Sequence, residues 1–324
     1  MKLSIAMCTY NGALYVQEQL KSIAAQTRMP DELVICDDHS SDNTLEIIES
    51  FATNAAFPVR IYINDKNLGS TKNFEKAVEL CDGELIALSD QDDVWHPEKL
   101  LRSEAALSLQ PGAGMVFTDA DIVDENMRSL NLRLWECVSF GNKEQKLFTA
   151  GKAFNVLFAR NVVTGTTMTF RSEFKPLILP VPTDFSVIHD GWIALMISAV
   201  AGIAFIPERA VKYRQHSGQQ VGAFRSAAKA GTPSTAMPQL TQVDYLAEAN
   251  RVKMMHERLT AYAGNHLRKD VGAQLHAKMT HFNVRARMPN RKYQRIPFVL
   301  KELSAFRYHL YSNGMYSAAR DLLG

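Results

Sequence analysis

The sequence predicts an α/β fold with a mixed, mostly parallel sheet, followed by a helical C-terminal region. Three observations favour this class. Short apolar runs of strand length recur in residues 1–120, amphipathic helical patterns lie between them, and the pattern from Val243 onward stays helical. Alternation of strand and helix is typical of a parallel sheet with helices on both faces.

The strand predictions rest on short apolar runs that are bounded by polar or turn-forming residues. Five runs in the first part of the chain are residues 3–8, 33–36, 59–63, 85–88 and 115–117. Residues 162–170, which include a small-residue bend, and residues 211–215 predict two later strands.

Three helices are predicted between these strands from apolar residues at helical spacing. Their apolar faces carry Val16, Leu20, Ile23 and Ala24; Leu45, Ile48 and Ala52; and Phe74, Ala77, Val78 and Cys81. Ser70 is the predicted N-cap of the third helix. Pro97 fits the first turn of a fourth helix that continues through Leu100 and Leu107.

A length of 324 residues indicates one large domain, or one domain with a smaller appendage. We expect an α/β domain at residues 1–220, then a loop and helical region at 221–324, with residues 218–238 as the loop. The chain is 46% apolar and can bury a sizeable core, while its net charge of +2 does not support a nucleic-acid-binding surface. Neither a signal peptide nor a bilayer-spanning segment is evident, so we expect a cytoplasmic protein, with contact at the inner membrane surface left open.

The four cysteines are expected to pack as small apolar residues. Their wide spacing matches neither a zinc motif nor a redox CxxC pair. They are Cys8, Cys36, Cys81 and Cys137.

Acidic clusters follow two of the predicted strands. Asp37-Asp38 comes after residues 33–36, and Asp90-Gln91-Asp92-Asp93 comes after residues 85–88. The carboxyl ends of parallel strands form the edge where ligands bind, so Asp38 could accept hydrogen bonds from a base or ribose. Three carboxylates so close together favour a divalent cation, Mg²⁺ or Mn²⁺. Helix capping and a solvated acidic turn are the alternatives.

Two later groups carry candidate chemistry. His189-Asp190 precedes an apolar helix, and Tyr213-Arg214-Gln215-His216 follows the last predicted strand. An Asp at a helix start is by default an N-cap. A His and an Arg after a strand could bind a diphosphate, complete a metal shell or lie at the surface.

Taken in order, these segments resemble the motifs of the family 2 glycosyltransferases, which have the GT-A fold. The resemblance covers about residues 1–220. It rests on Thr9-Tyr10-Asn11, Asp37-Asp38-His39-Ser40-Ser41-Asp42, Asn67-Leu68-Gly69, Asp90-Gln91-Asp92-Asp93-Val94-Trp95, Thr164-Gly165, His189-Asp190 and Tyr213-Arg214-Gln215-His216. The DQDDVW form, with TG and HDxW, is most similar to bacterial rhamnosyltransferases.

The resemblance implies a role for each matching residue. Asp190 is the implied catalytic base, and Asp92 and His216 are the implied metal ligands. The implied nucleotide-sugar-binding residues are Thr9, Tyr10, Asn11, Asp38, Asn67, Asp90 and Gln91. The implied acceptor-side residues are Thr164, Gly165, His189 and Trp192. Relatives often carry a bulky residue at the position of Gly191, which leaves the shape of the acceptor pocket open.

The implied activity is inverting transfer of a sugar, with L-rhamnose suggested by the resemblance, in cell-surface polysaccharide synthesis. The donor would be a dTDP- or UDP-sugar, and the acceptor a saccharide or lipid-linked saccharide. A cation on Asp92 would neutralise the leaving diphosphate, so that only a general base is required. An NAD-dependent oxidoreductase would need G-x-G-x-x-G after the first strand, where this chain has one glycine. A non-catalytic nucleotide-sugar-binding module would lack Asp92 or Asp190.

A basic and aromatic stretch near the C-terminus predicts either attachment to an anionic membrane surface or a solvated helical cap or dimer surface. It comprises Arg285, Arg287, Arg291, Lys292, Arg295, Phe298, Leu300, Phe306 and Tyr308.

Overall fold

The computed structural model describes residues 1–183, 188–219, 241–264 and 267–323. The chain divides into two compact units, Met1–Pro233 and Ser234–Gly324. The predicted loop at residues 218–238 falls almost entirely outside the described residues.

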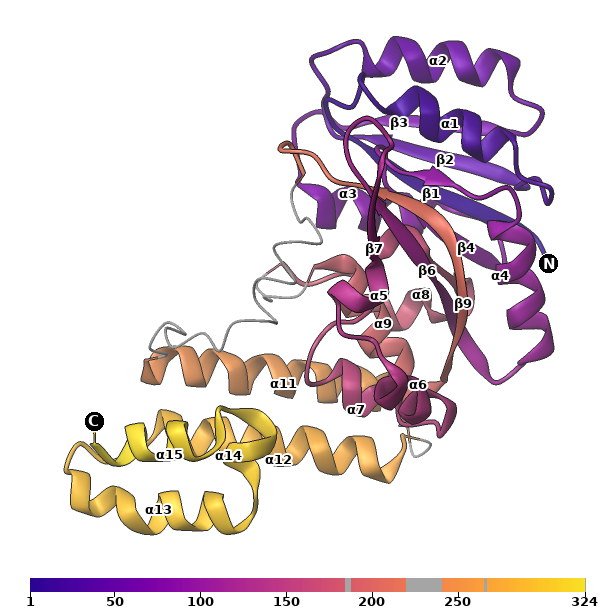
Figure 1. Ribbon diagram of the computed structural model, residues 1–324. Helices are drawn as coiled ribbons and strands as arrows, with labels where there is room; N and C mark the ends of the chain where they lie inside the picture. Colours follow the sequence, from indigo (N-terminus) through magenta and orange to yellow (C-terminus); the bar gives the residue numbers. More distant parts are fainter. Residues whose placement is uncertain (184–187, 220–240, 265–266, 324) are drawn as a thin grey trace. The chain divides into compact units, whose positions relative to one another are not determined.

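The first unit is built on a nine-stranded mixed sheet with the order β3-β2-β1-β4-β8-β6-β9-β5, and β7 pairs with β6 (Figure 1). Strands β1 to β4 are mutually parallel, and β8 runs antiparallel between β4 and β6. The strands are β1 (Leu3–Thr9), β2 (Glu32–Asp37), β3 (Val59–Ile63), β4 (Leu85–Ser89), β5 (Val94–Trp95), β6 (Ala113–Val123), β7 (Ser129–Arg133), β8 (Met168–Arg171) and β9 (Gly202–Arg214). This architecture confirms the predicted fold class.

Helices cover both faces of this sheet. One face carries α1 (Val16–Ala24), α2 (Thr44–Asn54) and α4 (Lys99–Leu109), whose apolar residues join one core cluster with β1, β2 and β4. The other face carries α3 (Ser70–Leu80) and α9 (His189–Val200), which pack against each other (Figure 1). Shorter elements are α5 (Leu134–Cys137), α6 (Asn142–Thr149), α7 (Ala153–Leu157), η1 (Gly165–Thr167), η2 (Ser172–Phe174) and α8 (Lys175–Ile178).

Local periodicity located the main helices, and several boundaries differ from the predictions. The strands predicted at 115–117 and 211–215 are longer in the structure, as β6 and β9. Ser70 is the first residue of α3, and the N-cap is Gly69, whose φ of 81° lies in the left-handed region that glycine tolerates. The predicted strand at 162–170 is ordered as a strand only from Met168. Its earlier part forms η1, because the Gly165 N–H bonds to Asp190 and the Thr167 N–H bonds to the Thr164 carbonyl. All four cysteines are buried and free, as predicted.

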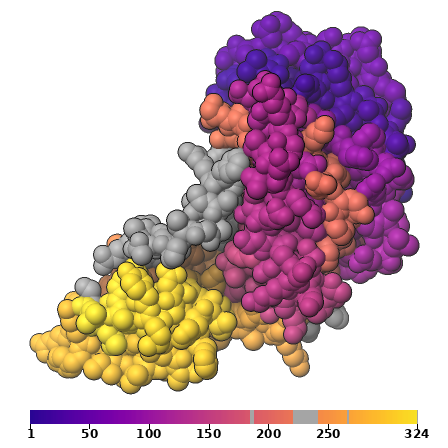
Figure 2. Space-filling view, viewed as in Figure 1, coloured from indigo at the N-terminus to yellow at the C-terminus, as the bar shows by residue number. Residues whose placement is uncertain are grey.

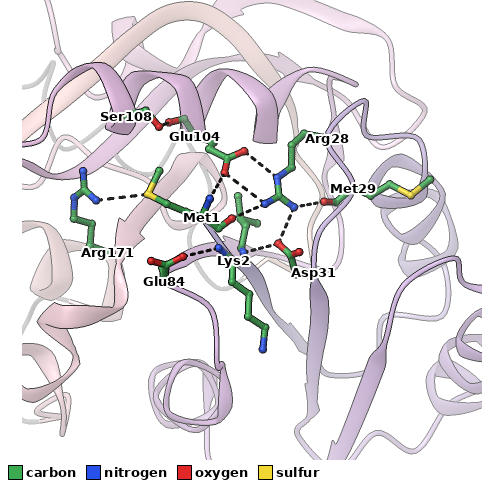
Figure 3. A network of polar contacts seen from close by, with 10 residues as sticks. Met1, Lys2, Arg28, Met29, Asp31, Glu84, Glu104, Ser108 and Arg171 are labelled. Carbon is green, nitrogen blue, oxygen red and sulfur yellow. Dashed lines mark hydrogen bonds and ion pairs between the residues drawn. The ribbon is translucent and has the colours of Figure 1, made fainter.

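An ion-pair network ties the amino end of β1 to its neighbours (Figure 3). The Arg28 guanidinium lies 3.0 Å from a Glu104 carboxylate oxygen and 2.8 Å from Asp31. Asp31 also accepts the Leu3 N–H at 2.7 Å. The network therefore stabilises the end of the sheet opposite the carboxyl ends of the parallel strands.

The second unit is helical, with α11 (Gln242–Ala263), α12 (Lys269–Ala286), α13 (Lys292–Ser304), α14 (Arg307–Tyr311) and α15 (Gly314–Leu323). Helices α11 and α12 pack together through Tyr245, Ala249 and Phe282. Two residues of the predicted basic and aromatic surface, Arg285 and Tyr308, are buried, so the prediction is wrong for them. Within the described chain, no helix is both long and apolar enough to cross a bilayer.

Candidate active site

The candidate site lies at the carboxyl ends of β2, β1 and β4. Parallel pairing places Thr9 beside Asp37 and Met7 beside Ser89, so the segments that follow these strands meet at one edge of the sheet. Burial is the main cause that raises the pKa of the Cys8 thiol in this region, and Asp90 and Asp38 both raise it further. Two of the acidic segments singled out from the sequence therefore lie close to the end of β1.

Asp37 and Asp38 have different surroundings. Asp37 is fully buried and accepts hydrogen bonds from the Thr9 hydroxyl at 2.7 Å and the Ser40 N–H at 2.8 Å. These bonds hold the turn after β2 against β1, and they occupy the Thr9 hydroxyl.

The Asp38 carboxylate organises the loop between β3 and α3. Its Oδ1 accepts from the Leu68 N–H and from Asn64 Nδ2, and its Oδ2 accepts from the Gly69 N–H, each at 2.8 Å. Asn67 donates to the Asp38 carbonyl at 3.4 Å. The buried Asn64 was not anticipated from the sequence, because an isolated asparagine in a polar loop has no distinguishing pattern.

Gln91 connects the segments that follow β1 and β4. Its amide oxygen accepts the Tyr10 N–H at 2.8 Å, and its amide nitrogen donates to the Tyr10 carbonyl at 3.0 Å. A Cβ at Gly12 would lie 2.1 Å from the Gln91 Oε1, so a larger residue there would displace the Gln91 amide from this position. The Tyr10 side chain is exposed, and Asn11 accepts the Ser41 N–H through its side chain at 2.8 Å. Tyr10 and Asn11 are thus presented on a loop that Gln91 anchors.

Four carboxylates act on one another at this edge. Burial raises the pKa of Asp90 to about 8, with further contributions from Asp92 and Asp190. Burial also raises the pKa of Asp93 well above its usual value, again helped by Asp92 and Asp90. Buried like charges of this kind are relieved by a proton or by a cation. The fold therefore brings Asp92 and Asp190, which are distant in the sequence, into one electrostatic cluster.

His216 lies against Asp92, with 2.9 Å between its Nε2 and the Asp92 Oδ2. The His216 ring packs on Tyr15 with 4.6 Å between ring centroids. The Arg214 guanidinium lies over the same Tyr15 ring, donates to the Asp92 carbonyl at 2.8 Å and pairs with Glu18. Arg214 thus supports the loop and does not present its charge to a ligand, and the supporting roles of Tyr15 and Glu18 were not predicted.

The residues around Asp92 fit a divalent cation that completes its shell with phosphate and water. Among the described residues, no three His, Cys, Asp or Glu side chains are grouped so as to hold a metal ion by themselves. Mg²⁺, however, is commonly bound through one or two carboxylates plus substrate phosphates. Asp92 and His216 would supply two ligands, and the buried Asp93 carboxyl lies close to Asp92, which helps burial to raise the Asp93 pKa.

Asp190 lies in the first turn of α9 and is almost completely buried. Its Oδ2 accepts the Gly165 N–H at 3.2 Å, and its Oδ1 accepts from Asn161 Nδ2 at 3.2 Å and from the Gly191 N–H. Burial raises the pKa of Asp190 to about 6, and these three donors limit the rise. The carboxylate is consequently ionised at neutral pH yet basic enough to take a proton. Like Asn64, Asn161 is an isolated asparagine that no sequence pattern predicts at this site.

The acceptor-side residues of the prediction have unequal exposure. His189 is buried and stacked on Phe74 at 4.1 Å, and burial lowers its pKa to about 3, so it is neutral. Trp192 is fully buried, and its ring N–H donates to the Ile178 carbonyl at 2.8 Å. Gly165 approaches so closely that a Cβ would lie 3.3 Å from the His189 Nε2. His189 and Trp192 are therefore both buried, whereas Thr164 is partly exposed.

The nine-stranded mixed sheet and the carboxylate cluster at its edge define a GT-A-type protein. The chain belongs to glycosyl transferase family 2, whose family model matches residues 4–174. An uncharacterized protein of Mycobacterium tuberculosis is 28% identical over 222 residues, which cover 66% of this chain and 59% of that protein. The chain therefore spans about three fifths of the length of this relative.

Other relatives carry functional names. An uncharacterized glycosyltransferase of Nostoc is 25% identical over 284 residues, which cover 81% of this chain and 83% of that protein. The dTDP-rhamnosyl transferase RfbG of Shigella flexneri is 41% identical over 98 residues, which cover 29% of this chain and 34% of that protein. Among solved structures, S. aureus TarS in complex with UDP-GlcNAc matches with a TM-score of 0.54 and 16% identity, over 98% of this chain and 90% of that chain. This structural match shows the fold.

Proposed function

We propose that this protein is a metal-dependent inverting glycosyltransferase that moves a sugar from a nucleoside diphosphate-sugar to an acceptor hydroxyl. The observation that carries the proposal is the position of Asp190. A buried carboxylate with a pKa of about 6 lies in the same electrostatic cluster as Asp90 and Asp92. This reaction requires a general base whose pKa is near neutral pH and a cation site close to that base.

Asp190 acts as the general base. It accepts the proton of the acceptor hydroxyl as the acceptor oxygen bonds to the anomeric carbon and the bond from that carbon to the diphosphate breaks. Attack from the face opposite the diphosphate inverts the anomeric centre. A Mg²⁺ or Mn²⁺ ion held by Asp92 and His216 would neutralise the negative charge of the leaving diphosphate. The donors from Gly165 and Asn161 hold the carboxylate in its ionised form.

The nucleotide binds along the loops after β1, β2 and β3. A carboxylate has about four lone-pair positions, and three of those on Asp38 are taken by Asn64, Leu68 and Gly69. The remaining position, on Oδ2, accepts the ring N–H of uracil or thymine. Tyr10 and Asn11, with Thr9, Asn67, Asp90 and Gln91, complete the proposed nucleotide-sugar site.

The proposed donor is a dTDP- or UDP-sugar, with dTDP-L-rhamnose as the first candidate. The match to the Shigella flexneri dTDP-rhamnosyl transferase supports this choice, and it covers 29% of this chain. A saccharide or lipid-linked saccharide is the proposed acceptor, approaching Asp190 along Thr164 and Gly165. We place the reaction in cell-surface polysaccharide synthesis.

The test begins with a thermal-shift screen of dTDP- and UDP-sugars, with and without Mg²⁺ or Mn²⁺, because a ligand of the folded state raises its stability. The stabilising donor is then incubated with saccharide acceptors, and the anomeric configuration of the product is read by NMR. The Asp190→Asn protein should still bind the donor and should transfer about 10²–10⁴-fold more slowly. Asp121→Asn is the matched control, since this carboxylate pairs with Arg209 on β9 and belongs to no candidate site.

Three outcomes would each contradict a part of the proposal. A product with retained configuration would exclude the inverting mechanism. Undiminished transfer by Asp190→Asn would remove Asp190 as the base. A donor that binds to the parent without any turnover across the acceptor panel would favour the non-catalytic binding module.

A further inference from the structure

A buried polar cluster in the second unit turns polar side chains of α15 toward the protein interior. Asp321 accepts two hydrogen bonds from the buried Arg285 guanidinium, at 2.7 and 2.9 Å, and a third from the Tyr308 hydroxyl at 2.7 Å. Ser317, also on α15, is buried and accepts the Asn313 N–H at 3.1 Å. This hydrogen-bonded cluster sets the rotation of α15 about its axis. Another rotation would leave Asp321 or Arg285 buried without its partner, which would destabilise the folded unit.

The same rotation turns apolar residues of α15 outward. Met315, Tyr316 and Leu323 have exposed fractions of 62%, 63% and 71%, and Ala319 is exposed between them. Positions 315, 319 and 323 repeat every four residues and share one face of the helix. A surface helix ordinarily directs its apolar stripe to the core, so α15 has the reverse arrangement along this face.

The neighbouring helices expose apolar residues as well. On α13, Tyr293, Ile296 and Leu300 follow helical spacing and are exposed, and on α14 Leu310 is exposed. These helices pack against one another within the unit, and their surface is drawn in yellow in Figure 2. We call the exposed apolar residues of this region the outer apolar set, which comprises Tyr293, Ile296, Phe298, Leu300, Phe306, Leu310, Met315, Tyr316 and Leu323.

Within residues 291–323, which carry the outer apolar set, the exposed charges have one sign. Residues 291–323, all of which the structure describes, contain six Lys or Arg and two carboxylate side chains. The carboxylates of Glu302 and Asp321 are only 1% and 11% exposed and are paired with Arg307 and Arg285. Arg291, Lys292 and Lys301 are exposed. The side chains of this segment that carry charge into the solvent are therefore positive, and none of them is a carboxylate.

We propose that α13 to α15 dock on an anionic lipid bilayer, with the outer apolar set entering the headgroup region and the exposed cations facing lipid phosphates. Exposed tyrosines suit the boundary between headgroups and acyl chains, and Lys and Arg side chains near such a surface are attracted by its negative potential. A second copy of the chain fits this surface poorly. In a two-fold symmetric dimer the same patch meets itself, so Arg291, Lys292 and Lys301 would face one another without carboxylates to pair with. The proposal does not depend on the transferase reaction.

The test uses the full chain and sedimentation with vesicles of phosphatidylglycerol or of phosphatidylcholine, at low and at high salt. The parent should sediment with phosphatidylglycerol vesicles at low salt, much less at high salt because salt screens the attraction, and not with phosphatidylcholine. The double variant Leu300→Gln/Met315→Gln should reduce the bound fraction at least tenfold, and Lys292→Gln/Lys301→Gln should do so at low salt. Leu109→Gln, at an 82% exposed apolar residue of the first unit, is the matched control and should bind like the parent.

A spectroscopic measurement keeps the proposal testable if a variant folds poorly. The chain has three tryptophans, all buried in the first unit, so Tyr316→Trp adds one exposed reporter. Its emission should shift to shorter wavelength with phosphatidylglycerol vesicles and stay unchanged with phosphatidylcholine. Absence of parent binding at low salt would overturn the proposal. So would equal binding by the parent and both double variants, or a dimer in light scattering that the Leu300→Gln/Met315→Gln protein loses while vesicle binding is unaffected.

Discussion

The ionisation of Asp190 can be shifted by changing a neighbouring amide. Asn161 donates to the Asp190 Oδ1 at 3.2 Å, and this bond favours the carboxylate over the carboxylic acid. Burial alone raises the pKa of Asp190, and Gly191, Gly165 and Asn161 together limit it to about 6. We therefore predict that Asn161→Ala raises the pKa of Asp190 further.

The size of the shift follows from the hydrogen bond that is lost. A hydrogen bond to a charged group contributes about 1.5–3 kcal/mol, and the 3.2 Å length places this one at the lower end. About 1.4 kcal/mol corresponds to one pKa unit, so Asn161→Ala should move the pKa of Asp190 up by about one unit, to about 7.

The assay is kcat/KM for sugar transfer between pH 5 and pH 9. A general base works when ionised, so activity rises with pH through its pKa. With a pKa of about 6 the parent should be about half active at pH 6, whereas the variant should have roughly a tenth of its maximum there. The difference should be about fivefold at pH 6 and almost absent at pH 8.

A second substitution separates titration from loop damage. Asn161 also accepts the Val163 N–H at 3.0 Å, and Asn161→Asp keeps that acceptor while it replaces the donor with a negative charge. In the plot of kcat/KM against pH, the rise on the acidic side should therefore occur at higher pH for Asn161→Asp than for Asn161→Ala. Equal midpoints for all three proteins, or a loss of activity by one factor at every pH, would refute the assignment of this rise to Asp190.

Three further predictions concern other parts of the first unit. His216→Ala should raise the Mg²⁺ or Mn²⁺ concentration for half-maximal activity at least about tenfold in a metal titration, and an unchanged value would exclude His216 as a ligand. Gly12→Val places a Cβ on the Gln91 amide, so the two bonds to Tyr10 should break and the KM for the donor should rise roughly tenfold with a smaller change in kcat. Burial lowers the pKa of Lys99 to about 7 from 10.5, so the folded protein binds fewer protons than the unfolded chain between these values and its stability should rise with pH there. From pH 7 to pH 9 this group should add about 2–3 kcal/mol to the free energy of unfolding, and denaturant titrations of Lys99→Met should lack that increase.

The sequence by itself determined the fold class and the edge of the sheet at which the chemistry is placed. Strand and helix periods are local properties, so the order of elements could be read from apolar spacing. The positions of Asp38 and Asp92 followed from one further rule, that parallel strands end at a common edge. The structure supports that rule through the pairing of β1 with β2 and β4.

The tertiary structure alone decided which side chains support the site and which face of each helix is buried. Asn161 reaches Asp190 across 29 residues, and Arg285 reaches Asp321 across 36. By its place in the sequence, Arg285 belongs to a basic stretch that is expected at the surface. It is nevertheless buried, because Asp321 accepts its hydrogen bond and the Tyr308 ring packs on its guanidinium. Whether a polar side chain faces water or the interior depends on partners that are distant in the chain, and a local pattern does not contain them.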